Sequence, residues 1–136
     1  VKHGTLLGTG GFCVVVEVEE IQLESDVLDE GPKDTNEEGA PLIQNRRFIS
    51  DNVLRYGQAR YAIKSLSPNL YLKARSTFLS GIVDLAMEVK YLSVLHHSHI
   101  IKMRGRANTH PCSDNFFIVL DRLHDTLKQR IEIWRK

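Results

Sequence analysis

The chain has 136 residues, of which 42% are hydrophobic and 26% charged, and its 18 basic and 17 acidic side chains give a formal net charge of +1. These values predict one globular domain and exclude a disordered chain, and no apolar run approaches the roughly 20 residues that a membrane-spanning helix needs. Two cysteines without a metal-type or redox spacing favour reduced thiols in an intracellular protein, cytoplasmic or nuclear. We expect no signal peptide, and we expect both ends to be cuts in a longer protein.

The charges are distributed unevenly along the chain. Residues 17–38 hold ten acidic residues and one base, Lys33, whereas the remainder holds 17 bases and seven acids. A basic body can bind nucleic acid, but these bases are scattered singly, apart from Arg46 and Arg47, and have few aromatic neighbours. We therefore predict neither a nucleic-acid partner nor a membrane partner.

The first half of the chain predicts a hairpin followed by an insertion. Residues 14–21, VVVEVEEI, are β-branched and partly alternating, which is typical of a strand with one packed face, and residues 3–8 supply its partner strand. Residues 24–45 are acidic, contain two glycines and two prolines, and lack any apolar period. We interpret them as a surface insertion.

The second half predicts three strands and two helices. Strands are expected at 59–66, 100–107 and 116–120, a helix at 81–96, and the opening of another helix at 124–134. Together with the hairpin, this order predicts an α+β fold in which an antiparallel five-stranded sheet carries one main helix.

The predicted helix 81–96 has a carboxylate on its apolar side. Five residues define the apolar face: Ile82, Leu85, Val89, Leu92 and Leu95. Glu88 falls inside this arc on a helical wheel. Because a carboxylate that leaves water must be paired or hydrogen-bonded to stay charged, Glu88 needs a cationic partner, and Lys64 at the end of an apolar strand would supply one.

Three glycines, Gly8, Gly10 and Gly11, lie at the turn of the first hairpin. Glycines permit tight turns and let backbone N–H groups approach phosphate oxygens. The sequence lacks the Gly-Lys-Ser/Thr run of a Walker A loop, and a strand follows the glycines where a dinucleotide-binding fingerprint needs a helix. A hairpin turn without a ligand remains the alternative at this point.

The same segment resembles the glycine-rich loop of eukaryotic protein kinases, GxGxxGxV with an aromatic residue before the third glycine. Gly8, Gly10, Phe12 and Val15 match this pattern in register, and Cys13 departs from it by standing at the third glycine's position. Three further segments resemble the family in the expected order: YAIK at 61–64, the helix with Glu88 followed by VKYLSVLHHSHII, and FFIVLDRL at 116–123. Outside the acidic insertion, the chain is thus similar to the N-terminal lobe (N-lobe) of a kinase.

The resemblance implies an ATP site. Lys64 would contact the α- and β-phosphates, and Glu88 would pair with Lys64 and orient it. Leu120 would be the gatekeeper residue at the back of the adenine pocket, while the Asp121 carbonyl and the Leu123 N–H would hydrogen-bond adenine. The residues implied in holding the nucleotide are Leu7, Gly8, Gly10, Gly11, Phe12, Val15, Ala62, Lys64, Leu120, Asp121 and Leu123, among which Leu7, Val15 and Ala62 would form the roof over the base.

Two motifs of the kinase family are missing from this sequence. The HRDxxxxN and DFG motifs, which supply the catalytic base and the Mg²⁺ ligands of kinases, do not occur in the 136 residues. We therefore interpret residues 1–136 as a partial kinase domain: the N-lobe, the hinge and the start of the next helix, with the C-lobe absent. The parent protein would phosphorylate protein hydroxyls, with Ser/Thr favoured over Tyr, and the fragment alone would be inactive. The alternative is a non-catalytic pseudokinase or truncated N-lobe that acts as an interaction module.

Two further residue groups were weighed. Cys13 beside Lys64 could have a lowered thiol pKa and be reactive, or could simply be a small residue tolerated at a glycine position, which we favour. A histidine- and cysteine-containing group could suggest zinc, but it lacks the paired spacings of structural zinc sites, so we predict no metal site. This group comprises His96, His97, His99, His110 and Cys112.

Overall fold

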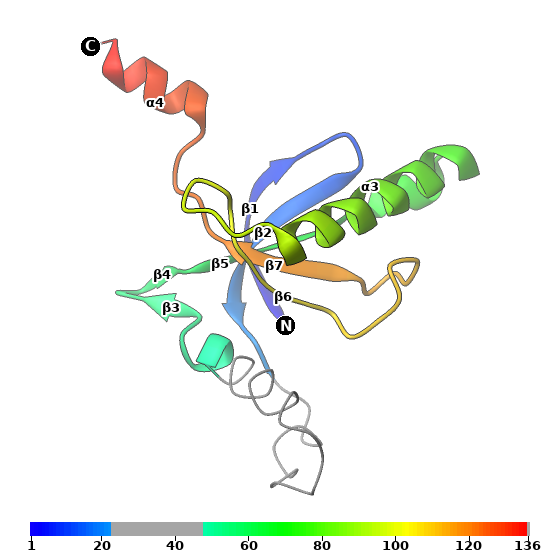
Figure 1. The fold of residues 1–136 in the computed structure, drawn as a ribbon, viewed down its shortest axis with the longest axis horizontal. Coiled ribbons are helices and arrows are strands. Elements are labelled where there is room, and N and C mark those ends of the chain that lie inside the picture. Colours follow the sequence, from blue (N-terminus) through cyan, green and yellow to red (C-terminus); the bar gives the residue numbers. More distant parts are fainter. Residues whose placement is uncertain (23–47, 136) are drawn as a thin grey trace, which may run out of the picture.

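The computed structural model describes residues 1–22 and 48–135, so the predicted acidic insertion at 24–45 lies outside the described residues. Five antiparallel strands form the main sheet, in the order β1-β2-β5-β7-β6. Their bounds are β1 Lys2–Thr9, β2 Cys13–Glu20, β5 Tyr61–Leu66, β6 Met103–Arg106 and β7 Phe117–Asp121. The helix α3, Arg75–Val94, lies along the sheet (Figure 1). The prediction of an α+β fold with a five-stranded antiparallel sheet and one main helix is confirmed.

Strand β5 is the centre of the molecule, because both of its faces are covered. Leu66 faces α3 in a cluster with Leu85 of the helix and Ile118 of β7. On the other face, Tyr61 and Ile63 pack with residues of the segment that precedes β3. This two-sided burial explains why YAIKSL is apolar at consecutive positions instead of alternating cleanly.

A small hairpin precedes β5 and was not predicted. Strands β3, Leu54–Arg55, and β4, Gln58–Ala59, pair with each other and not with the main sheet. Tyr56 and Gly57 between them have φ angles of 52° and 74°, as the two central residues of a type I′ turn require. Ala59 therefore belongs to this hairpin, and β5 begins at Tyr61 instead of at the predicted residue 59.

Helix α3 begins six residues before its predicted start. The 3-10 helix η1, Pro68–Leu72, leads into it, and Gly81, which we took as the first helical residue, lies inside it. Of the predicted apolar face, the first four residues pack against the core, whereas Leu95 follows the helix end and is exposed. The placement of Leu95 on the packed face is therefore wrong.

The remaining predicted elements are present; β6 and α4 are shorter than predicted, and β1, β2 and β7 differ from the prediction by one residue at each end. Helix α4, Leu127–Trp134, begins after Thr126, whose hydroxyl accepts the Gln129 N–H while the Gln129 side chain accepts the Thr126 N–H. This capping box sets the helix start three residues after the predicted residue 124.

No helix within the described ranges is long and apolar enough to cross a membrane.

Gly81 is the position at which α3 approaches the rest of the core most closely. A Cβ added there would lie 2.6 Å from the Cδ2 atom of Leu70 and 3.2 Å from the Cβ atom of Phe12. Leu70 is fully buried, so its side chain has little room to move away. The absence of a side chain at Gly81 thus lets the helix dock on both η1 and the glycine hairpin.

We expect Gly81→Val to destabilise the fold by about 1–3 kcal/mol, because the added atoms overpack a filled core. Gly105→Val is the matched control, since an added Cβ at Gly105 meets nothing within 4 Å and valine suits a strand. Urea unfolding of both variants measures the effect. Equal free energies of unfolding for the two variants would contradict the packing role of Gly81.

Candidate functional site

The candidate site is centred on an ion pair between the sheet and the helix. Lys64 Nζ on β5 lies 2.5 Å from Glu88 Oε2 on α3, and the two side chains are 24% and 29% exposed. The sequence predicted this pair from the misplaced carboxylate on the apolar side of the helix. Because both groups are partly withdrawn from water, the pair fixes the ammonium group at one place on the sheet.

Four of the predicted residues share one face of the sheet. In the antiparallel register, Val15 lies opposite Lys64, and Ala62 lies opposite Leu120. Directly opposite residues point to the same side, as do residues two apart along a strand. Val15, Ala62, Lys64 and Leu120 therefore form one surface next to α3, with the cation of Lys64 at one end of it.

Leu7, Asp121 and Leu123 lie at the margins of this surface. Leu7 sits at a register shift in β1, and its side chain is partly exposed. Asp121 ends β7, and its carboxylate holds Arg104 through two bonds of 2.7 and 2.8 Å. The bond with Asp121 raises the pKa of Arg104. Leu123 follows the strand and is largely exposed.

The glycine hairpin is closed by a backbone bond of 2.7 Å from the Gly10 N–H to the Cys13 carbonyl. Its glycines do not adopt the left-handed conformation, since Gly57 is the only glycine with a positive φ among those described. An added Cβ at Gly8 or Gly11 would meet nothing within 4 Å. Neither backbone strain nor packing thus requires glycine at these two positions, whereas close approach of a ligand to the backbone would.

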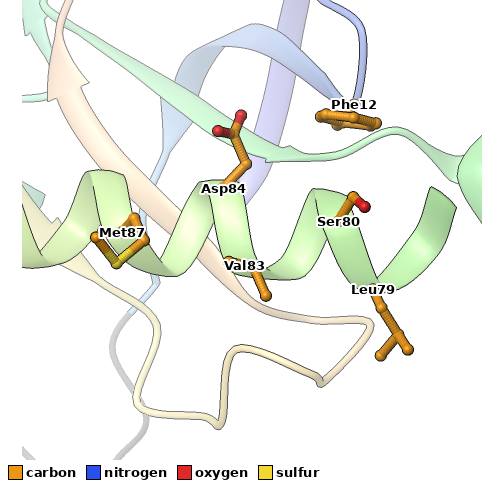
Figure 2. Close-up of a pocket in the computed structure, with 6 residues that line it drawn as sticks. All are labelled: Phe12, Leu79, Ser80, Val83, Asp84 and Met87. Carbon is orange, nitrogen blue, oxygen red and sulfur yellow. The ribbon is translucent and has the colours of Figure 1, made fainter. Parts of the chain in front are cut away.

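Phe12 follows the glycines of the hairpin and is partly buried. Its side chain packs against the core next to α3, and the Ser67 N–H donates to its carbonyl at 2.8 Å. Phe12 lines a groove of about 460 Å³ beside the helix. Figure 2 shows Phe12 above the helix. The groove is lined by Phe12, Leu79, Ser80, Val83, Asp84 and Met87. Phe12 therefore packs the hairpin against the helix and lines this groove.

A second ion pair was not predicted from the sequence. Arg122 Nη2 lies 2.5 Å from Glu17 Oε1, and each side chain is 19% exposed. The Arg122 Nε atom is buried without a hydrogen-bond partner among the described residues. Glu17 follows Val15 by two positions, and Arg122 follows Leu120 by two positions, so both residues belong to the face that carries Val15 and Leu120. This two-residue spacing was the sequence signal for the pair. Side chains two positions apart on a strand share a face, so Glu17 and Arg122 can be predicted to meet once the strand order is known.

Cys13 is a buried thiol. Its side chain is 5% exposed within the core cluster, and burial raises its pKa, with the positive charge of Lys64 acting in the opposite direction. The hypothesis of a reactive, low-pKa Cys13 is therefore wrong, because loss of hydration outweighs the nearby cation. The structure favours the simpler interpretation of a small residue at a glycine position.

Local contacts are found within the histidine- and cysteine-containing group of His96, His97, His99, His110 and Cys112. The His97 and His99 rings meet edge to face at 5.2 Å, and the Cys112 N–H donates to His110 Nδ1 at 3.2 Å. Within residues 1–22 and 48–135, no three His, Cys, Asp or Glu side chains are grouped so as to hold a metal ion.

Taken together, the candidate site offers a fixed cation, an open glycine backbone beside it, and apolar side chains on the same face, of which Ala62 and Leu120 are buried. Such a combination suits a ligand with an anionic part and a flat apolar part. Comparison of the chain with protein-family models, curated proteins and solved structures found no match.

We expect Cys112 to be alkylated by iodoacetamide much faster than Cys13 at pH 8. Cys112 is exposed, whereas Cys13 is buried with a raised pKa, and the thiolate is the reacting form. Peptide mass spectrometry over a time course measures both rates in one sample, and unfolding in urea should equalise them. Equal rates in the folded protein would contradict the burial of Cys13.

Proposed function

We propose that this chain is the ATP-binding N-lobe of a protein kinase that transfers the γ-phosphoryl group of ATP to a protein Ser/Thr hydroxyl. The observation that carries the proposal is the Lys64–Glu88 ion pair, which holds a cation on the surface formed by Val15, Ala62 and Leu120. ATP supplies the phosphoryl group; the residues described here would bind and orient it.

The phosphate end of the site would be formed by Lys64 and the glycine hairpin. An ammonium group has three N–H donors, of which Glu88 takes one, so Lys64 can also donate to phosphate oxygens. The open surroundings of Gly8 and Gly11 let their backbone come close to a phosphate. Glu88 acts on the nucleotide only through Lys64, so it is a positioning residue.

The base end would lie on the apolar part of the same face. Val15 would provide apolar surface for a base, and the buried side chains of Ala62 and Leu120 lie behind it on the same face. Asp121 and Leu123 would contribute backbone groups, because the Asp121 carboxylate is already occupied by Arg104. The partly exposed Leu7 would cover the base from β1.

Two components of phosphoryl transfer have no counterpart in the 136 residues. The sequence contains neither an HRD motif for a catalytic base nor a DFG motif for Mg²⁺. The described residues offer no grouped ligands for a metal ion either. We therefore assign no catalytic base and no Mg²⁺ ligand to this chain.

A second candidate function is that of a non-catalytic interaction module, such as a pseudokinase N-lobe. The observation that favours it is the row of exposed apolar side chains along the outer side of α3: Leu79, Val83, Met87 and Tyr91. Exposed apolar surface of this kind often marks protein contacts. Retention of the Lys64–Glu88 pair favours the nucleotide-binding function over this alternative.

We expect Lys64→Met to weaken ATP binding about ten- to a hundredfold, because charge-assisted hydrogen bonds to phosphate are lost. Lys90→Met is the matched control, since Lys90 is exposed on the same helix as Glu88. Binding is measured by titrating the ¹⁵N-labelled chain with ATP and following amide resonances. If the unaltered chain does not bind ATP, or if Lys64→Met binds it equally well, the proposed function fails.

We also expect the 136-residue chain alone to lack phosphotransfer activity, because no catalytic base or Mg²⁺ ligands accompany its nucleotide site. Incubation with radiolabelled ATP and a mixed Ser/Thr/Tyr peptide substrate measures this directly. Robust turnover that disappears in Lys64→Met would show that the chain contains a complete active site, contrary to this prediction.

A further inference from the structure

The Glu17–Arg122 ion pair lies on the same face as the proposed nucleotide site. Glu17 stands opposite Ala62 in the β2–β5 register, so the two side chains point to the same side of the sheet. Arg122 follows Leu120 by two positions and reaches Glu17 on this face. The pair therefore borders the apolar surface formed by Val15, Ala62 and Leu120.

The ion pair also spans the central strand. Glu17 belongs to β2 and Arg122 follows β7, while β5 lies between these strands in the sheet order. Two strand spacings amount to about 9.5 Å, which two long side chains together can bridge. A bridge at this position in the register passes beside Ala62, which is 3% exposed.

Arg122 is held by its backbone as well as by its side chain. Its N–H donates to the Arg60 carbonyl at 2.9 Å, immediately after β7 ends at Asp121. The following residue, Leu123, is largely exposed and belongs to no strand. Arg122 thus joins the end of β7 to the sheet through its backbone and its side chain, and its Nη1 atom also lies 3.1 Å from His124 Nδ1, on the far side of Leu123.

We propose that Glu17 and Arg122 are positioning residues for the base of a bound purine nucleotide. Their ion pair closes the outer end of the base surface and fixes residues 121–123 against it. This inference rests on the proposed function, and it adds to that function two residues with a role at the base end. Neither residue contacts the phosphates, and both act by holding the segment that carries Leu123.

The two ion pairs of the site then have separate tasks. Lys64 and Ala62 are two residues apart on β5, which is about 6.6 Å along the strand. The Lys64–Glu88 pair serves the phosphate end, and the Glu17–Arg122 pair serves the base end. A ligand with phosphates but no base should therefore depend on the first pair and be indifferent to the second.

The test compares ATP with inorganic tripolyphosphate, which carries the phosphates without a base. Both are titrated into the ¹⁵N-labelled chain and into the variants Glu17→Gln, Arg122→Gln and the charge exchange Glu17→Arg/Arg122→Glu. Glu19→Gln is the matched control, because Glu19 lies on the same strand and pairs with Lys2 at 2.9 Å in an exposed position. Thermal unfolding of every variant shows that it is folded.

We expect each single variant to bind ATP about tenfold more weakly and tripolyphosphate unchanged, because removal of one partner of a partly buried pair releases the other. The charge exchange should bind ATP within about threefold of the unaltered chain, as a double-mutant cycle between interacting partners predicts. The amide resonance of Leu123 should shift with ATP in the unaltered chain and lose this shift in Arg122→Gln.

Three results would overturn the inference. Equal ATP affinity in the unaltered chain and both single variants would show that the pair does not position the base. Equal weakening of ATP and tripolyphosphate would show a general structural effect, as would failure of the charge exchange to recover affinity. These results leave the proposed function standing, whereas absence of ATP binding by the unaltered chain would overturn both.

Discussion

The fold and the candidate site both depend on how the charge of Lys64 is accommodated at the centre of the sheet. Strand β5 is covered on both faces, so a lysine in it needs a carboxylate close by. Glu88 supplies this carboxylate from α3, at 2.5 Å. The same contact therefore joins the helix to the central strand and holds the ammonium group of Lys64 in place.

Period-two alternation along β5 gives its two faces different neighbours. Tyr61 and Ile63 point into the cluster that packs against the segment before β3, whereas Ala62 and Lys64 point to the other side. Both faces are packed, and the face toward α3 also carries a small residue and a cation. The opposing strands extend this division, because each directly opposite residue shares the face of its partner.

The sequence predicted those elements and contacts that a local pattern indicates. It did not predict the contacts between segments that are distant along the chain. Alternation and helical spacing predicted the five strands, the main helix and the pairing of Lys64 with Glu88. The hairpin of β3 and β4 was missed because its strands are two residues long and pair only with each other. The Glu17–Arg122 pair was missed because it spans β5, which becomes evident only when the strand order is known. The start of α3 was missed because Gly81 looks like a helix boundary, although close packing explains it.

Cys13 and Phe12 determine which part of the glycine hairpin can respond to a ligand. Cys13 is buried with Leu66, and Phe12 packs beside Gly81 of α3, so this end of the hairpin is tied to the core. Gly8 and Gly11 have open surroundings, and they lie before this tied end. Cys13 stands where the kinase pattern has its third glycine. The backbone at this position is therefore less free than at a glycine, but the buried side chain holds it to the core. In the proposed nucleotide site, adjustment of the hairpin to a phosphate group would then come from the segment between β1 and Phe12.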